Sequence, residues 1–397
     1  MKIIGLMSGT SADGIDVALC DIQGAPPKLS ASIIHAATYP YDEALRSRIL
    51  AACRPETSSV SSLCVLNFDL AQAFVHAIMN LLDSADVLPA EVDLIASHGQ
   101  TVWHNVTDDG RVNATLQLGE ASLIAEWTGI TTLHNFRARD VAAGGQGAPL
   151  TGYVDWILLR HPTRWRAIQN IGGMGNVSFL APLSQPSAEP IAFDTGPGNA
   201  LMDAAISFMS EGGLHYDMGG MWASEGRLDE AWLAELMEHP YYAQTPPKTT
   251  GRETFGVPMA VRLVMQGRER GLSDVDIMAT LTALTAQSIA DAYQRFAPQR
   301  IDEIIIGGGG AHNPVLLQQI AQFTGAPMLK HEDIGIESDY KEALVFAVLG
   351  YETWHNRPAT LPSLTGAEHA SVLGQISPAA NYADLIQRTW TGQRSGA

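Results

Sequence analysis

The chain has 397 residues, of which 46% are hydrophobic and 17% are charged. This length predicts two domains, and the composition is typical of folded proteins rather than disordered ones. The formal net charge of −18 argues against a nucleic acid or an anionic membrane as partner, because the mean field would repel either. Three cysteines show no disulfide framework and no CxxC spacing, and there is no signal-like apolar run, so we expect a cytoplasmic protein.

Two apolar strands, expected over residues 2–6 and 15–20, are joined by a tip of small and hydroxyl residues. This pattern predicts a β-hairpin, followed by a third strand over 30–39. Glycines let the backbone approach an anion, hydroxyls can donate to phosphate oxygens, and Asp13 and Asp16 can hold a hydrated cation. The alternative for such a tip is a tight, capped turn without a ligand.

A long helix is expected over residues 60–83, where apolar side chains recur every three or four positions. A buried strand over 92–97 then ends in a polar run that contains His98 and His104. Such runs at the carboxyl ends of strands are where α/β sheets place ligands. The two histidines have no nearby carboxylate or cysteine, which favours hydrogen-bonded loop structure or a role lining a site over a metal centre.

The segment 136–149 places Arg137 and Arg139 beside a glycine-rich loop. In an acidic protein, two such cations suit the binding of a carboxylate or phosphate, because guanidinium groups donate in a planar fork. The alternative is a pair of surface charges with Asp140 as their partner. We place a domain transition near Arg164.

The second half opens as the first did, with a strand from Arg166, a small-residue tip and a strand that reaches Leu180. The repetition indicates a structural duplication, in which two glycine-tipped hairpins face one another across a cleft and hold a nucleotide phosphate tail. Next, a strand is expected to end at Asp194, just before a helix. There Asp194 is either a helix cap or a general base aimed into the cleft.

Four later segments complete the pattern. A basic loop is expected over 246–253, and it is either solvated or functional. Ser273 is expected to cap a helix that ends at Phe296. The glycine run 307–310 opens a helix near Pro314, an arrangement that suits a flat ring or a phosphate but does not match GxGxxG. A last apolar helix is expected to start near Lys341.

Together these motifs resemble, in order, those of the anhydro-N-acetylmuramic acid kinases. The motifs are GLMSGTSADGID, SHGQTVWH, FRARDVAAGGQGAPL, NIGGMGNVSFL, FDTGPGNALMD, PPKTTGRE, GGGGAHNP and KEALVFA. The resemblance implies a two-domain, actin-like (ribonuclease H-like) α/β ATPase fold, with duplicated mixed sheets flanked by helices and an interdomain cleft. It also implies a cytoplasmic homodimer that recycles peptidoglycan sugar. We expect one domain over 1–164, completed by 338–397, and a second over 165–337.

The implied reaction uses ATP and Mg²⁺. The 1,6-anhydro ring is hydrolysed at C1 while O6 takes the γ-phosphoryl group, which gives N-acetylmuramic acid 6-phosphate. By resemblance, the ATP-binding run falls on Gly9 to Asp16 and the catalytic acid on Asp194. A carboxylate that removes a proton from water lets the water attack C1, and the released O6 is itself the nucleophile toward phosphorus. Glu342 is the second candidate for a catalytic role near that water.

These considerations predict three sets of ligand-binding residues. For ATP they are Gly9, Thr10, Ser11, Ala12, Asp13, Gly14, Ile15, Asp16, Gly172, Gly173, Asn176, Gly308 and Gly309. For the sugar they are Gln100, Arg137, Arg139, Gln146 and Asn199. For Mg²⁺, held through water, they are Asp13 and Asp16.

Two alternatives stay open. Levoglucosan kinases resemble the same family and act on 1,6-anhydroglucose, which has the anhydro ring without the N-acetyl and lactyl groups. The lactyl carboxylate needs a cation, so Arg137 and Arg139 favour the muramic sugar. A non-catalytic actin-like ATP sensor has less reason to keep Asp194. One departure from the family, Met218-Gly219 in place of a lysine and an acid, leaves substrate detail undecided.

Overall fold

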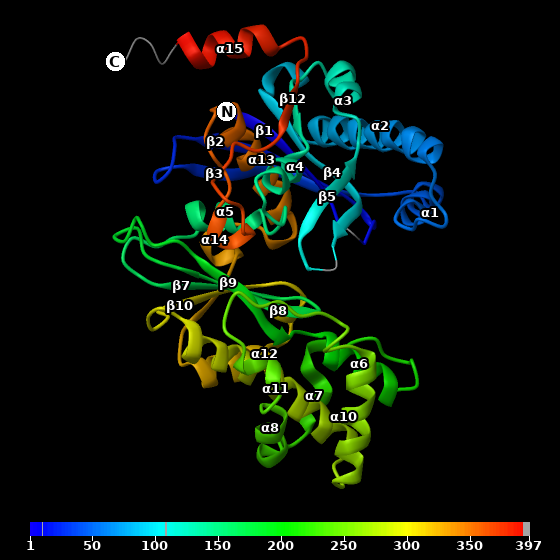
Figure 1. Cartoon of the computed structure of the whole chain (residues 1–397), viewed down its shortest axis with the longest axis vertical. Helices are drawn as coiled ribbons and strands as arrows, with labels where there is room; N and C mark the ends of the chain where they lie inside the picture. Colours follow the sequence, from blue (N-terminus) through cyan, green and yellow to red (C-terminus); the bar gives the residue numbers. More distant parts are fainter. Residues whose placement is uncertain (10, 108, 392–397) are drawn as a thin grey trace. The chain divides into compact units, whose positions relative to one another are not determined.

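The computed structural model describes residues 1–9, 11–107 and 109–391. The chain divides into two compact units (Figure 1). Unit 1 consists of Met1–Leu158 and Asp339–Ala397, and unit 2 consists of Leu159–Ser338. The second unit is therefore a continuous piece of chain inserted between the two parts of the first.

The sheet of unit 1 has seven strands among the described residues, in the order β12-β6-β4-β1-β2-β3, with β5 paired to β4. Strands β1, β2 and β3 are antiparallel neighbours, whereas β4 runs parallel to β1 and β6 runs parallel to β4. The strands are β1 (Lys2–Ser8), β2 (Gly14–Gln23), β3 (Ser30–Pro40), β4 (Leu94–Val106), β5 (Val112–Leu118), β6 (Thr132–His134) and β12 (Gln375–Ser377).

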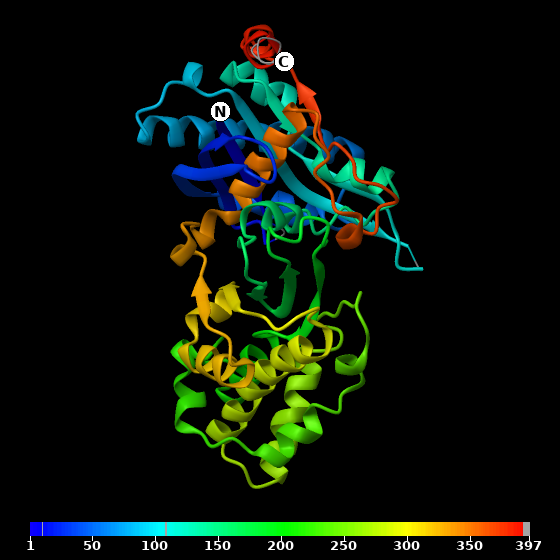
Figure 2. The ribbon, with the colours of Figure 1, turned by 90° about the vertical axis from the view of Figure 1, so that its left-hand side faces the viewer.

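Helices α2 (Val60–Ser84) and α13 (Lys341–Trp354) cover opposite faces of this sheet. Ile4 and Leu6 of β1 belong to the core that includes the buried face of α2. The residue between them, Gly5, faces α13, where an added Cβ would lie 1.9 Å from the carbonyl oxygen of Ala343. Successive side chains of a strand point to opposite faces, so α2 and α13 lie on opposite sides of β1. Figure 2 shows α13, in orange, crossing the strands.

Of the described helices, α2 alone is long and apolar enough to span a membrane, a test that buried core helices also pass. Its apolar face is occupied by the sheet. The other helices of unit 1 are α1 (Glu43–Ala52), η1 (Pro89–Glu91), α3 (Ala121–Thr128), α4 (Phe136–Ala142), α5 (Thr151–Leu158), α14 (Pro362–Thr365) and α15 (Tyr382–Thr391), with η5 (Ser338–Tyr340) at the junction.

One segment expected to be a loop forms regular structure. The polar run with His98 and His104 lies inside β4, which continues to Val106 because it pairs with β5. This expectation was wrong because a partner strand cannot be read from local composition. The two arginines of the segment 136–149 lie on α4, directly before the glycine-rich loop.

The sheet of unit 2 repeats the arrangement of unit 1. Its order is β11-β10-β7-β8-β9, in which β7, β8 and β9 are antiparallel, β10 runs parallel to β7 and β11 runs parallel to β10. The same pattern of three antiparallel strands followed by two parallel ones confirms the predicted duplication and the actin-like α/β fold. The strands are β7 (Arg166–Ile171), β8 (Met174–Leu180), β9 (Ile191–Pro197), β10 (Glu303–Gly307) and β11 (Met328–Lys330).

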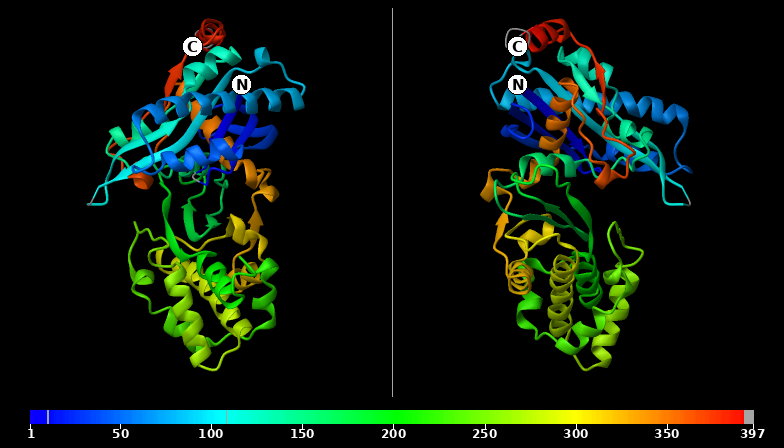
Figure 3. Two further views of the ribbon diagram at one scale, coloured as in Figure 1. Left: turned by 90° about the vertical axis from the view of Figure 1, so that its right-hand side faces the viewer. Right: turned by 60° about the vertical axis from the view of Figure 1, so that its left-hand side comes forward.

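Helices gather beside one another on the sheet of unit 2, green to yellow in Figure 3. The longest, α11 (Asp274–Phe296), is buried along most of its length and begins at Ser273 with a capping box, as predicted. The others are α6 (Ala200–Met209), η2 (Met218–Gly220), α7 (Met221–Glu225), α8 (Glu230–Leu236), α9 (Pro240–Ala243), α10 (Val257–Glu269), η3 (Gly309–His312), α12 (Pro314–Thr324) and η4 (Glu332–Ile334).

Candidate active site

Buried polar groups at the end of β1 support the first hairpin tip, which joins β1 to β2. The Oγ of Ser8 lies 2.8 Å from the hydroxyl of Tyr41 and 3.1 Å from the carbonyl oxygen of Gly14. Ala12 has a φ of 52° and donates its N–H to the carbonyl of Gly9, which closes the turn. The predicted hairpin is therefore confirmed.

The predicted ATP residues of this tip differ in what they offer a ligand. Ala12 and Ile15 are buried in the core, so only their backbones are available. Ser11 and Asp13 are exposed, while Gly9, Gly14 and Asp16 are partly buried. Thr10 lies outside the described residues.

Gln100 supports the hairpin tip. Its side chain is fully buried, and its Oε1 accepts from Ser8 at 2.5 Å. Its Nε2 donates to the carbonyls of Gly9 at 3.1 Å and Thr101 at 3.2 Å. In this structure the amide thus serves the tip, and its contact with the sugar stays a prediction.

Asp13 and Asp16 have different surroundings. Asp13 is exposed and pairs with Arg46 at 3.2 Å, a type of surface contact that contributes little. Asp16 accepts from Thr38 at 2.6 Å, and its pKa is raised, mainly by burial and further by Asp339, although the Thr38 bond lowers it. In the described part of the chain, no three His, Cys, Asp or Glu side chains form a metal site by themselves.

Arg137 is held at two points inside unit 1. Its Nε donates to Nε2 of His98 at 2.8 Å, and its Nη1 donates to the carbonyl of Gly147 at 2.7 Å. Burial lowers the pKa of the guanidinium, whereas the charges of Glu342 and Asp140 raise it. Arginine stays protonated in proteins, so a fixed cation is placed beside two acids.

His98 accepts from Arg137, which requires a neutral ring. Its Nδ1 lies 2.7 Å from the carbonyl oxygen of Gly99, so Nδ1 carries the proton and donates. Burial, and then the charge of Arg137, lower the pKa of His98 to about 3. Both ring nitrogens are therefore occupied, which argues against the metal interpretation. His104 in turn makes a hydrogen bond to Thr115.

Glu342 stands in the first turn of α13. Its side chain keeps an exposed face, yet the surrounding protein raises its pKa, Arg137 lowers it and Asp16 raises it. The predicted catalytic Glu342, the predicted sugar residue Arg137 and the predicted cation residue Asp16 thus interact electrostatically, although they come from distant parts of the sequence.

The two arginines of α4 are separated from one another. Residues two positions apart on a helix point about 200° apart, and Arg139 is exposed where Arg137 is partly buried. Asp140 is fully buried and accepts from the N–H of Gly147 and the hydroxyl of Thr365, both at 2.7 Å. Asp140 therefore organises the glycine-rich loop, and the surface-pair alternative is wrong.

Gln146, on that loop, is exposed. Its N–H donates to the carbonyl of Thr365 at 2.8 Å, and its side chain is 3.5 Å from the carbonyl oxygen of Gly110. Its amide is therefore weakly held and open to a ligand.

In unit 2, the second tip, Gly172 and Gly173, packs on the start of α6. The N–H groups of Asn199 and Ala200 donate to the carbonyls of these glycines at 2.8 and 3.0 Å. The side chain of Asn199 donates to the carbonyl of Ile171 at 3.3 Å. Asn199 was expected to bind the sugar, but its neighbours are predicted ATP residues.

The glycine run adjoins the same tip. Gly308 has a φ of 79°, and an added Cβ would lie 2.5 Å from Oδ1 of Asn170. An added Cβ on Gly309 would lie 3.5 Å from Nδ2 of Asn199. The predicted ATP residues Gly172, Gly173, Gly308 and Gly309 are therefore gathered around Asn199.

Asp194 lies within β9, opposite Asn176 of β8, and not at a strand end. The cap of α6 is Asn199, so the capping alternative is wrong. The carboxylate accepts from the N–H of Thr250 at 2.9 Å. Burial raises the pKa of Asp194, and the Thr250 bond lowers it. Asp194 is therefore a partly buried carboxylate that accepts one backbone hydrogen bond, an arrangement that suits a general base.

The sequence reasoning missed Arg252 and Asp203. The guanidinium of Arg252 is 3.8 Å from where a Cβ of Gly173 would stand. Burial raises the pKa of Asp203 to about 6, and Arg252 lowers it. A cation thus stands at the second tip. The motif PPKTTGRE contained the signal, because it places two cations, Lys248 and Arg252, close together in a strongly acidic chain.

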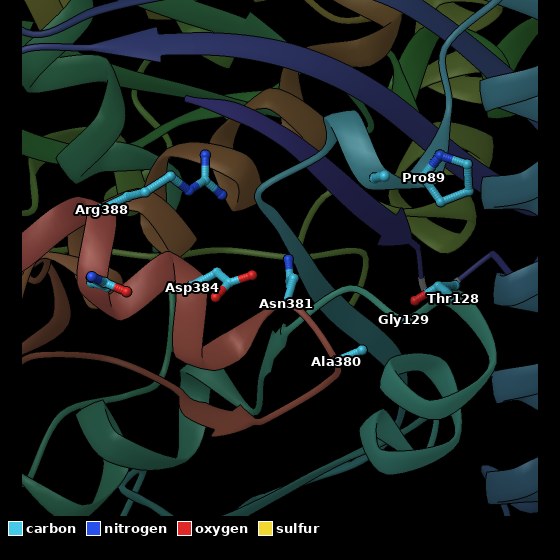
Figure 4. A pocket seen from close by; sticks show the side chains of 9 residues that line it. Pro89, Thr128, Gly129, Ala380, Asn381, Asp384 and Arg388 are labelled. Atoms are coloured by element: carbon cyan, nitrogen blue, oxygen red, sulfur yellow. The ribbon is translucent and has the colours of Figure 1, made fainter.

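Unit 1 also has a groove with a volume of about 940 Å³, lined by residues other than those described above (Figure 4). None of the predicted site residues lines it. Arg388 in its wall pairs with Asp93 at 3.0 Å, and Asn381 holds Thr131 and Asp93, so these groups serve the packing of the C-terminal segment. It is lined by Pro89, Ala90, Thr128, Gly129, Ala380, Asn381, Asp384, Gln387 and Arg388.

Comparison with known proteins places these motifs in one family. The family model described as anhydro-N-acetylmuramic acid kinase matches residues 1–379. The chain belongs to this family. Over 382 residues it is 42% identical to the anhydro-N-acetylmuramic acid kinase of Caldanaerobacter subterraneus subsp. tengcongensis, covering 94% of this chain and 96% of that protein. The family member of Acaryochloris marina is 44% identical over 380 residues, with coverages of 95% and 99%.

Among solved structures, component A of (R)-2-hydroxyglutaryl-CoA dehydratase from Acidaminococcus fermentans has a TM-score of 0.41 and 12% identity, covering 88% of this chain and 96% of that one. The family match confirms the resemblance that the motifs predicted.

Proposed function

We propose that this chain uses ATP to convert 1,6-anhydro-N-acetylmuramic acid into N-acetylmuramic acid 6-phosphate. The observation that carries the proposal is the family match over residues 1–379. Asp194 supports it, because a partly buried carboxylate with a raised pKa and a single backbone donor is what a general base requires.

In the proposed mechanism, Asp194 takes a proton from a water molecule, and the water oxygen attacks C1. The bond between C1 and O6 breaks, with inversion at C1 as in an inverting glycosidase. The freed O6 then attacks the γ-phosphorus of ATP, the bond from this phosphorus to the bridging oxygen breaks, and ADP leaves. The leaving group of the first step is thus the nucleophile of the second. Burial raises the pKa of Asp194, which makes it more basic than a surface aspartate, while the N–H of Thr250 favours its ionised form.

For ATP we propose the two glycine tips and the glycine run as phosphate and nucleoside contacts, with Arg252 as a cation for the phosphates. Mg²⁺ supplies neutralisation of phosphate charge. Asp13 and Asp16 would hold the ion through water. Burial and the charge of Asp339 disfavour the ionised form of Asp16, and a nearby cation would offset both effects. A cation that keeps most of its waters needs no dense ligand cluster.

For the sugar we propose Arg137 as the partner of the lactyl carboxylate. His98 and the carbonyl of Gly147 hold its Nε and Nη1, and its Nη2 makes no hydrogen bond among the described residues. A guanidinium oriented in this way is prepared for a carboxylate. Levoglucosan has no carboxylate, so Arg137 favours the muramic sugar. We also propose that the enzyme is cytoplasmic and forms a homodimer. Light scattering would test the oligomeric state.

A coupled assay of ADP release tests the proposal directly. We expect kcat/KM for anhydro-N-acetylmuramate to exceed that for levoglucosan by at least about 100-fold, because a sugar that lacks the carboxylate leaves Nη2 of Arg137 without a partner. A ratio near one, or a preference for levoglucosan, contradicts the muramic assignment. ATP turnover that ignores every anhydro-sugar contradicts both kinase functions and favours the ATP sensor.

A further inference from the structure

Lys248 is a buried cation without a salt bridge to any carboxylate among the described residues. Its side chain is 6% exposed. Its Nζ donates to the carbonyls of Tyr241 at 3.3 Å and Tyr242 at 3.2 Å. It also lies over aromatic rings, 4.7 Å from the centroid of Tyr241 and 4.8 Å from that of Phe296. Asp291 acts on this ammonium group through its charge but forms no salt bridge with it among the described residues. Burying a charge whose direct partners are carbonyls and rings is costly, which points to a specific role for this lysine.

The segment that contains Lys248 holds Asp194 at three points. Asp194 donates its N–H to the carbonyl of Lys248 at 3.1 Å. The hydroxyl of Tyr241 donates to the carbonyl of Asp194 at 2.7 Å, and the N–H of Thr250 donates to its carboxylate at 2.9 Å. Strand β9 is at the edge of its sheet, so without this segment the outward backbone groups of Asp194 would have no partner.

Lys248 joins the two ends of that segment. Its backbone carbonyl accepts from the N–H of Asp194, and Thr250, two positions later, donates to the carboxylate. Its ammonium group donates to the carbonyl of Tyr241, and the hydroxyl of Tyr241 donates to the carbonyl of Asp194. The hydrogen bonds form a closed ring from Asp194 through Tyr241 and Lys248 back to Asp194. An uncharged apolar side chain at 248 would open this ring.

We propose that Lys248 is a positioning residue that fixes the orientation of the Asp194 carboxylate. The proposal rests on the proposed function, in which Asp194 is the base. A base must lie within hydrogen-bond reach of the proton it removes, so loosening the segment lowers the rate of the chemical step without weakening ATP binding.

The test compares Lys248→Met with Lys248→Arg, and with Lys330→Met as a control at an exposed lysine of the same unit. Lys248→Met is expected to lower kcat about 10- to 100-fold, part of the contribution of a general base, with KM for ATP changed less than about 2-fold. The acid limb of kcat should move to higher pH, because the hydrogen bond from Thr250, which lowers the pKa of Asp194, is loosened with the segment. Lys248→Arg should recover most of kcat, and Lys330→Met should match the wild type.

If Lys248 has a purely structural role, Lys248→Met lowers the melting temperature but leaves kcat and its pH profile unchanged in the folded fraction. This result overturns the proposal. If Lys248→Met does not fold, Tyr241→Phe removes one hydroxyl from the same ring. It is expected to lower kcat several-fold at constant KM for ATP, and an unchanged kcat overturns the proposal. A wild type inactive on anhydro-sugars refutes the proposed function itself, whereas an active wild type with an unaffected Lys248→Met variant refutes only the role of Lys248.

Discussion

The Asp194 carboxylate receives one backbone hydrogen bond, from Thr250, in surroundings that otherwise disfavour its charge. The variant Asp194→Asn keeps the shape and removes the base. We expect kcat to fall by at least about 1000-fold and the Kd for ATP to stay within about 3-fold, since the amide still fits β9. Coupled kinetics and calorimetric titration of ATP check this, and a kcat within 10-fold of the wild type would remove Asp194 from the role of base.

Arg137 and Arg139 provide a matched pair of variants on one helix. Because Arg137 is held by His98 and Gly147 while Arg139 is exposed, Arg137→Ala should raise KM for anhydro-N-acetylmuramate at least about 10-fold, the range of a lost charge-assisted bond. Arg139→Ala should raise it much less. KM values for both sugars, with melting curves as a folding control, decide the matter; equal effects at the two positions would contradict the assignment to Arg137.

At the scale of elements, the contact between β1 and α13 joins the first hairpin to Glu342. An added methyl group at Gly5 would lie 1.9 Å from the carbonyl oxygen of Ala343, so Gly5→Ala must push helix and strand apart. We expect a loss of about 1 to 3 kcal/mol, as for overpacked cores. Gly9→Ala is the stability control, because its Cβ would meet nothing closer than 3.8 Å. Thermal unfolding measures both, and equal melting temperatures would show that the contact yields easily.

At the scale of the whole molecule, Asp203 makes stability depend on pH. Its pKa is about 6 in the folded protein and about 3.9 in an unfolded chain. Between these values the folded state binds the extra proton, so the contribution of Asp203 to stability is full below pH 4 and decreases as the pH rises to about 6. The melting temperature of the wild type relative to Asp203→Asn should therefore decrease over this interval and level off above it. Parallel curves for the two proteins would show that the pKa of Asp203 is not raised.

Much of the fold and part of the candidate site followed from the sequence alone, because their signals are local. Glycine tips between apolar strands predicted both hairpins and the duplication, and Ser273 predicted the start of α11. Motif order identified the family. In these cases the chemistry of a few neighbouring residues is sufficient, since turns, caps and strand periodicity depend on contacts within a short stretch of chain.

Only the tertiary structure decided which polar side chains are free to meet a ligand. Gln100 was a candidate ligand residue in the sequence, and in the structure its amide is used by Ser8 and Gly9, more than 90 positions away. Arg137 and Arg139 were equivalent candidates in the sequence, but the helix points them in different directions. The loop with Lys248 was expected to be either solvated or functional, and the structure places this lysine over aromatic rings. A side chain's availability depends on long-range partners that periodicity does not encode, so the sequence determined the fold and the chemistry present, while packing determined which groups can act.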